Sequence, residues 1–188
     1  LLTYEPLDWN RFGAFQDVTM RLIAERLLPE GSPKTYIKEE VVSQQVALGP
    51  PLPGHRFHAY CSPNVQNSTE VLRSLSDDLK LDVRTTEEIG DLAMCDHFLV
   101  YLHGKTWTSG EASDAFAAEV RKAMGMPGIK LLLVHEMVGT GQEERFGCEF
   151  DQFFRSPPDG TPGDLVQRSI YKAIAVSMKA GAWREASK

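Results

Sequence analysis

Polar side chains that could bind a small molecule fall at three places in the sequence, each shortly after an apolar run. Ser62 and Asn64 come first, Trp107 and Ser109 form the second group, and His135 directly follows the run LLLV. Loops after the strands of a parallel sheet present backbone amides and helix N-termini to anions. We therefore expect these residues to contact a nucleotide-like ligand, with the indole stacking and the hydroxyls and imidazole donating hydrogen bonds.

Each of these positions also has a structural interpretation. Ser62 and Asn64 could simply form a loop and a helix cap, because the chain has neither of the glycine-rich patterns GxGxxG and GxxxxGK[ST] that cradle phosphates. A tryptophan such as Trp107 more often covers the edge of a core than binds a base. His135 and its neighbour Glu136 could transfer protons or bind a ligand. Both interpretations stay open from the sequence.

No metal site is expected. The pair His135 and Glu136 resembles the start of HExxH, but the second histidine would have to stand where the chain has Gly139. The three cysteines, Cys61, Cys95 and Cys148, are too few and too widely spaced for a disulfide framework or a CxxC site. We expect all three to be unreactive, with acidic neighbours raising the pKa of the last one.

Composition restricts the class of partner. With 20 basic and 26 acidic residues the net charge is −6, which gives no basic surface for nucleic acid. The apolar runs are far shorter than the roughly 20 residues that cross a bilayer, so we expect no membrane contact by this segment. The cysteine pattern suits a reducing compartment. We therefore expect a cytoplasmic protein, or, because the chain begins at Leu1 and could be a fragment, the cytosolic part of a larger membrane protein.

The elements that position these residues follow an alternating strand and helix pattern. Apolar runs predict strands over 57–61, 81–85, 97–102 and 131–134, the third being covered on both faces. Helices are predicted from Asn67 to residue 79, briefly from 86, over 111–125, and from 161 to about 180. This order predicts an α/β fold, a mostly parallel four- to five-stranded sheet with helices on both faces.

The first 54 residues form a separate unit in this interpretation. Phe15, Val18 and Leu22 recur on one face of a predicted amphipathic helix that stops at Pro29. Residues 35–48 fit a helix or a strand equally well, and GPPLPG at 49–54 reads as a linker. The expected organisation is a helical extension with a proline-rich linker at 1–54 and an α/β domain at 55–188.

Three stretches resemble the Toll/interleukin-1 receptor (TIR) family and its flavodoxin-like relatives. They are FHAYCSP at the first strand, AMCDHFLVYLHGKTWTSG around the third strand, and FAAEV in the next helix. The resemblance covers residues 56 to about 180. It implies that Glu119 in FAAEV matches the catalytic glutamate of those family members that cleave NAD. The chain departs from the family where DVRTTEEIGDL passes almost directly into the next helix, because TIR domains usually have a long loop there.

The resemblance leaves three functional hypotheses. The first is a TIR-like signalling or regulatory module that acts through a protein partner or self-association, as part of a larger protein. The second is an NAD glycohydrolase in which Glu119 is catalytic, with NAD as substrate and no certain cofactor. The third is a domain that senses a nucleotide without cleaving it. Release of nicotinamide separates the second hypothesis from the others.

Overall fold

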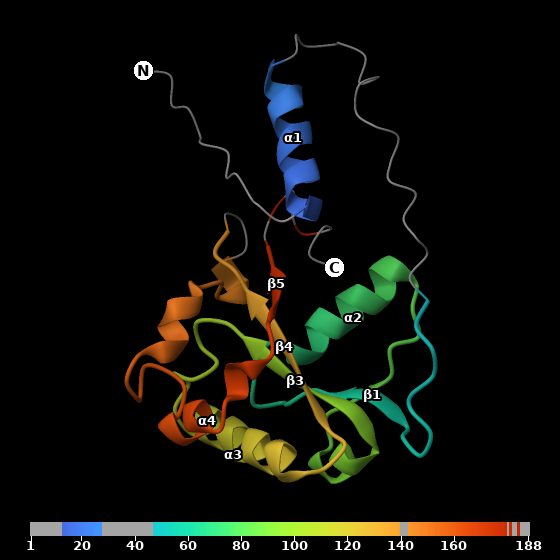
Figure 1. Ribbon diagram of the computed structural model, residues 1–188, viewed down its shortest axis with the longest axis vertical. Helices are drawn as coiled ribbons and strands as arrows, with labels where there is room; N and C mark the ends of the chain where they lie inside the picture. Colours follow the sequence, from blue (N-terminus) through green and yellow to red (C-terminus); the bar gives the residue numbers. More distant parts are fainter. Residues whose placement is uncertain (1–12, 28–46, 140–142, 180, 182–183, 185–188) are drawn as a thin grey trace.

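The computed structural model describes residues 13–27, 47–139, 143–179, 181 and 184, and within this part five strands form one parallel sheet. The strand order is β2-β1-β3-β4-β5 (Figure 1). The predicted α/β fold with a parallel sheet is thereby confirmed. The strands are β1 (Phe57–Tyr60), β2 (Thr85–Thr86), β3 (Cys95–Leu102), β4 (Lys130–Glu136) and β5 (Val176–Met178).

Strand β3 is the centre of the sheet. It pairs with β1 on one side and with β4 on the other, where Phe98 lies opposite Leu131 and Leu102 opposite His135. All of its residues except His97 are buried. A near-continuous apolar run is what a strand covered on both faces requires, since both sets of alternating side chains must leave water.

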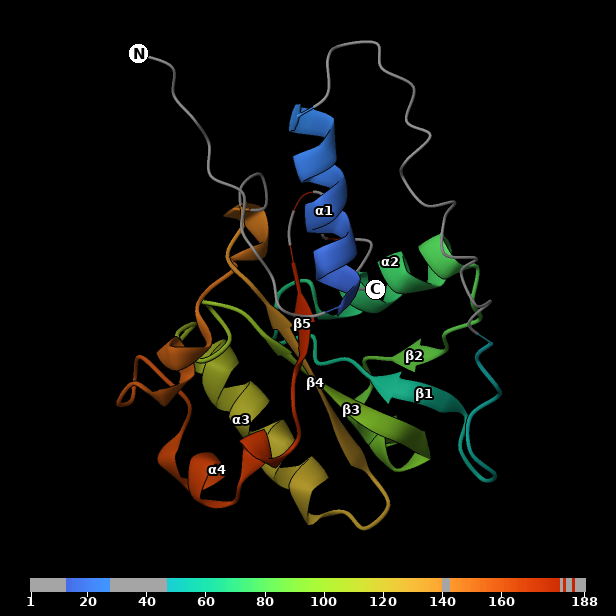
Figure 2. The same ribbon diagram turned by 45° about the horizontal axis from the view of Figure 1, so that its top comes forward.

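Helices cover both faces of this sheet. The chain moves outward from β1 to β2 through α2 (Ser68–Leu79), and in the opposite direction from β3 to β4 through α3 (Glu111–Gly125). Because crossovers between parallel strands are right-handed, opposite directions place these two helices on opposite faces (Figure 2). Shorter helical segments complete the set: η1 (Ile89–Met94), η2 (Glu143–Arg145), η3 (Phe150–Phe154), α4 (Gly163–Gln167) and η4 (Ile170–Lys172).

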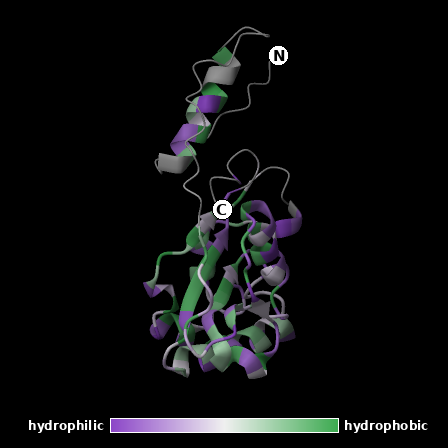
Figure 3. Ribbon diagram, turned by 90° about the vertical axis from the view of Figure 1, so that its right-hand side faces the viewer, coloured by the Kyte–Doolittle hydropathy of each residue, from purple (hydrophilic) through white to green (hydrophobic). Residues whose placement is uncertain are grey.

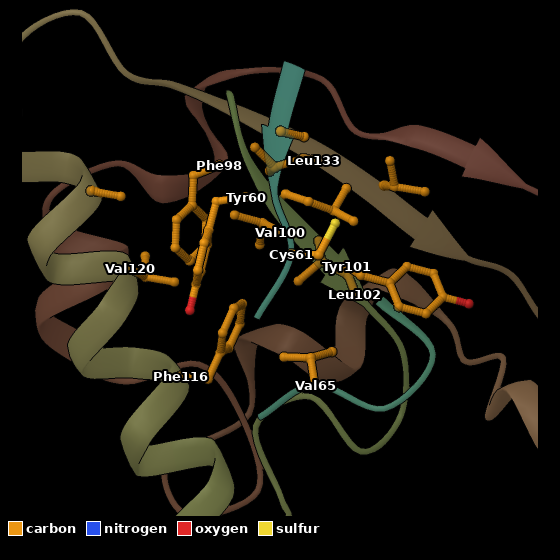
Figure 4. Close-up of a cluster of buried hydrophobic side chains, with 14 of the residues drawn as sticks. Tyr60, Cys61, Val65, Phe98, Val100, Tyr101, Leu102, Phe116, Val120 and Leu133 are labelled. Carbon is orange, nitrogen blue, oxygen red and sulfur yellow. The ribbon is translucent and has the colours of Figure 1, made fainter. Parts of the chain in front are cut away.

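An aromatic stack joins the sheet to α3. The ring of Phe98 lies between Tyr60 and Phe116, with centroids 5.1 and 5.9 Å away. All three side chains are fully buried, and Figure 4 shows the Tyr60 oxygen pointing toward α3 between Phe116 and Val120. Hydrophobic residues concentrate in the strands, and hydrophilic ones lie on the outer segments (Figure 3). This packing fixes the position of α3 against the end of β1.

The proline-rich segment is held on the domain by one buried carboxylate. The Leu52 amide donates to both oxygens of Asp96 at 3.1 and 3.2 Å, and His55 Nδ1 lies 2.6 Å from Asp96 Oδ1. Burial alone would raise the pKa of Asp96, but the bonds from His55 and Leu52 bring it below its usual range. The segment therefore packs against the start of β3.

The N-terminal helix is present as α1 (Gly13–Leu27). Phe15 is buried, and Lys179, which follows β5, lies over its ring at 5.8 Å from the centroid. Met20 and Leu27 are exposed. Part of the predicted apolar stripe is thus covered, near the end of β5. The ambiguous stretch falls on residues 35–46, which lie outside the described part of the chain, and on Ala47 and Leu48, which have no regular structure.

Several predicted elements are wrong in detail. The strand expected over 81–85 is only β2, and the helix expected from residue 86 is the 3-10 segment η1. The Asn67 side chain makes no capping bond, and its φ of 64° places it in the left-handed region. The long last helix ends at Gln167 and gives way to η4 and then to β5. The sheet therefore gains an edge strand where the sequence indicated a helix.

Candidate functional site

Asn64 and Glu119 meet at the carboxyl end of β1. The Asn64 side-chain amide donates to Glu119 Oε1 at 2.8 Å. Asn64 is brought there by the loop after β1, and Glu119 lies on α3 one residue before buried Val120. Both side chains are half-buried. The structure thus brings together two of the candidate residues that lie 55 positions apart in the sequence.

Tyr60 closes the inner side of this pair. Its hydroxyl and Glu119 Oε2 are both enclosed, and neither makes a hydrogen bond of normal geometry within the described residues. Burial, followed by the nearby Glu119 carboxylate, raises the pKa of Tyr60 above its usual value, so the phenol stays protonated. A neutral hydroxyl and a carboxylate therefore face each other inside the protein. No spacing pattern in the sequence singles out Tyr60, because it lies within a strand.

Ser62 makes hydrogen bonds within its own loop. Its Oγ accepts a hydrogen bond from the backbone amide of Asn64 at 3.1 Å, and its carbonyl accepts one from Ser68 Oγ at 2.7 Å. Ser62 is fully buried. These bonds set the turn that presents Asn64 to Glu119, so the serine positions the site from within.

Trp107 and Ser109 are also bonded internally. The Trp107 indole donates to the Tyr171 hydroxyl at 3.2 Å and packs on Phe116 at 5.1 Å, and only 6% of the residue is exposed. Ser109 Oγ donates to the Lys105 carbonyl, and the Ser109 amide donates to Ser113 Oγ, both at 2.8 Å. The indole thus covers the edge of the core, and the serine stabilises the turn before α3.

His135 lies inside β4 and its ring is buried. Its Nε2 donates to the Cys148 carbonyl at 2.9 Å, and Phe150 and Phe153 meet it edge-on. Burial lowers the pKa of His135 below the usual value, so the ring is neutral at neutral pH. This geometry makes the histidine a structural anchor for the segment after β4.

Glu136, the next residue, holds a buried ion pair. Arg184 Nη1 lies 2.5 Å from Glu136 Oε1, and the Tyr101 hydroxyl donates to Glu136 Oε2 at 2.7 Å. The glutamate is fully buried, and Arg184 Nη2 is enclosed without a hydrogen-bond partner in the described residues. The ion pair ties Arg184 to the end of β4. No local spacing could reveal it, because the partners are 48 positions apart.

His103 is a second residue that sequence reasoning missed. It follows β3, is 1% exposed, and accepts the Lys105 amide on Nδ1 at 3.1 Å. Its Nε2 faces the backbone of Gln66 without a hydrogen bond of normal geometry. Burial lowers the pKa of His103 to about 4. A single histidine in a loop carries no pattern from which this burial could be read.

A groove lies beside these loops, next to Trp107. A hollow of about 460 Å³ runs between α3 and the segment 157–163, and one of about 120 Å³ adjoins His103. The two hollows share Trp107, Thr108 and Asp159. Neither of them includes Glu119 among its lining residues.

The cysteines are buried free thiols. Burial raises the pKa of Cys61 to about 12, and it raises the pKa of Cys95 and Cys148 to about 11. The acidic neighbours Glu149 and Asp151 also raise the pKa of Cys148, as expected, but burial raises it more. Within the described residues no group of three potential ligands could hold a metal ion.

Comparison with known proteins adds no assignment: no family model, curated protein or solved structure matches the chain. Among the described helices, none combines the length and apolar character that crossing a membrane would need.

Proposed function

We propose that this chain is a TIR-like signalling or regulatory module that acts through protein contacts. The observation that carries the proposal is that the expected ligand-binding side chains are already bonded within the protein. Asn64 bonds to Glu119, Trp107 to Tyr171, and His135 to the Cys148 carbonyl. A nucleotide would have to replace these bonds, each contributing about 0.5–1.5 kcal/mol and more where a charge takes part.

The exposed edge of β5 supports contacts with another protein. Within the described chain β5 pairs only with β4, so no described strand pairs with its outer edge. Ile174 is 96% exposed and Val176 is 46% exposed beside that edge. Apolar side chains on an open strand edge favour pairing with another chain. This edge is where we place self-association or the contact with a partner.

Two measurements test the proposal. Nicotinamide release from NAD should stay at background for the purified chain and for Glu119→Gln. Sedimentation velocity should show concentration-dependent association that Val176→Lys weakens, because a lysine on the edge opposes strand pairing. The matched control Ile89→Lys, at a residue of similar exposure to solvent on η1, should associate like the original chain. Glu119-dependent nicotinamide release would overturn the proposal.

One observation favours the NAD glycohydrolase as a second candidate. Glu119 Oε2 has no hydrogen-bond partner in the described residues, while Asn64 fixes the other oxygen. A carboxylate held in this way could stabilise the positive charge that develops when the nicotinamide–ribose bond breaks. The assay separates the candidates, with Glu111→Gln as the matched control on the exposed side of the same helix. Catalysis requires loss of activity in Glu119→Gln and full activity in Glu111→Gln.

Nucleotide sensing without cleavage is the third candidate, and it predicts a different result. A nucleotide that binds only the folded state raises the melting temperature without any turnover. A thermal shift with NAD that disappears in Glu119→Gln, in the absence of nicotinamide release, would favour it.

A further inference from the structure

The groove beside Trp107 has fixed walls. One wall is a face of α3 that includes Ser113, Asp114 and Arg121, and the opposite wall is the segment 157–163. That segment is held by the bonds Thr161 N–H to the Phe153 carbonyl and Asp159 N–H to the Ser156 carbonyl, both 3.0 Å. Concave sites of several hundred Å³ that exist before binding are typical of ligand sites.

Gly160 lies at a tight turn in the segment 157–163. A Cβ at this position would lie 2.2 Å from the Arg155 carbonyl oxygen and 2.9 Å from its carbon, so the chain there packs against its own backbone. This tight turn in the groove wall therefore requires glycine at position 160.

The neutral polar side chains that line the larger hollow are already bonded within the protein. Trp107 bonds to Tyr171, Ser113 Oγ donates to the Thr106 carbonyl at 2.9 Å, and Thr108 Oγ1 donates to the Gly104 carbonyl at 3.1 Å. The charged side chains on the walls and the apolar surface of the prolines are therefore the features that could recognise a ligand.

That charge is negative in the larger hollow. Asp114 and Asp159 are exposed lining residues, whereas the one lining cation, Arg121, is bound by Asp164 through two bonds of 2.7 and 2.8 Å. Because Asp164 balances that cation, the two aspartates leave a negative charge on the larger hollow, and Arg155 lines the smaller hollow on the other side of Asp159. A cleft with an excess of one sign of charge concentrates ligands of the opposite sign.

The apolar part of the lining comes from Pro157, Pro158 and Pro162, together with the edge of Trp107. These rings are rigid, so burying an apolar stem against them costs little conformational entropy. A ligand that combines an apolar stem with a cationic head fits both features. An arginine side chain has this chemistry, and its planar guanidinium forms paired bonds with carboxylates.

We propose that this groove binds an arginine-containing extended segment of a partner protein, with the guanidinium between Asp114 and Asp159. This inference rests on the proposed function, since it names the kind of partner that an interaction module would bind. Extended peptides held by proline lose little entropy on binding, which makes them suitable probes.

The test uses two peptides that differ in a single charge. The full chain, labelled with nitrogen-15, is titrated with acetyl-Gly-Pro-Arg-Pro-Gly-amide and with its counterpart in which neutral citrulline replaces arginine. The amide signals of residues 107–114 and 157–163 should shift with the arginine peptide. Loss of the charge should weaken binding about tenfold, as two modest ion pairs together would predict.

Variants of the walls locate the site. Asp114→Asn and Asp159→Asn should each weaken binding of the arginine peptide by about two- to fivefold. Asp77→Asn, an exposed residue on α2, changes the net charge equally and should bind like the original chain. Unchanged spectra outside the groove show that each variant is folded.

Equal binding of both peptides, no shifts at millimolar peptide, or wall variants that bind normally would overturn the groove assignment. None of these results would affect the proposed function, which is tested by the absence of NAD turnover and by association through β5. Conversely, Glu119-dependent turnover would overturn the proposed function and leave the peptide result as a separate binding property.

Discussion

The side-chain amide of Asn64 donates a 2.8 Å hydrogen bond to Glu119 and so joins the loop after β1 to the second half of α3. Tyr60 faces the same carboxylate from the core, and Ser62 fixes the turn that carries the asparagine. Asn64 thus holds the glutamate from the loop, and Tyr60 encloses it from the core. A carboxylate held in this way either stabilises the fold or is preorganised for chemistry, and stability and turnover measured on the same variants separate the two roles.

Asn64→Asp should destabilise the protein, because it places a second carboxylate against Glu119. We expect a loss of about 1–3 kcal/mol in the free energy of unfolding at pH 7, measured by urea titration. Adding Glu119→Gln should recover most of this loss, since the repulsion is removed. Gln66→Glu makes the same charge change at an exposed side chain of the same loop and serves as control. Equal stability of Asn64→Asp and the original chain would show that the pair contributes nothing.

The buried ion pair of Glu136 and Arg184 should matter more. Removing the cation leaves an uncompensated carboxylate that is fully buried, so Arg184→Met should cost about 3–5 kcal/mol in the free energy of unfolding. The double variant Glu136→Gln with Arg184→Met should be more stable than Arg184→Met alone, because the charge is gone. Arg168→Met, at an exposed arginine, is the control. If Arg184→Met unfolds at the same urea concentration as the original chain, the ion pair does not stabilise the fold.

The sheet could be predicted from the sequence wherever a strand is buried on both faces. The runs that became β3 and β4 stand out because almost every residue is apolar, and the parallel arrangement follows from the helices between strands. Strand β5 could not be read in this way. Its region has helix-like apolar spacing, but Ser169 takes a φ of 62° and Tyr171 reaches both Trp107 and Thr161. Tertiary contacts decide the local structure there.

The sequence indicated which loops carry the candidate residues, but not how their side chains are bonded. The order of strands and helices placed Ser62, Trp107 and His135 near the sheet edge, yet whether they face inward or outward depends on partners far along the chain. Tyr171 lies 64 positions from Trp107. The same limit applies to the groove, whose walls come from α3 and from a loop more than 30 residues later. Such pairings have no periodic signature in a single sequence.

Asp96→Asn should release the proline-rich segment from the domain. The substitution removes the charge that binds His55 and weakens the bonds from the Leu52 amide, so the free energy of unfolding should fall by about 1–2 kcal/mol. Trypsin should then cut faster after Arg56, which is exposed next to this segment. Asp82→Asn, on the surface, should be cut at the original rate. Equal cleavage of all three proteins would contradict the anchoring role of Asp96.

Acid should destabilise the protein through His103. Its pKa is lowered by burial to about 4, whereas a histidine in the unfolded chain has a pKa near 6.5. Between these values only the unfolded state takes up the proton, so stability is complete above about pH 6.5 and falls as the pH drops toward 4. For His103 alone the loss between pH 7 and pH 5 is about 2 kcal/mol.

His103→Gln tests this pH dependence, because a glutamine can still accept the Lys105 amide and has no proton to exchange. The measurement is the free energy of unfolding by urea at pH 7 and at pH 5. The difference between the two values should be about 2 kcal/mol smaller in the variant than in the original chain, whatever the absolute stability of either. His135, whose pKa burial also lowers, should leave a residual loss in the same direction. If the pH dependence is the same in both proteins, His103 does not hold a depressed pKa in the folded state.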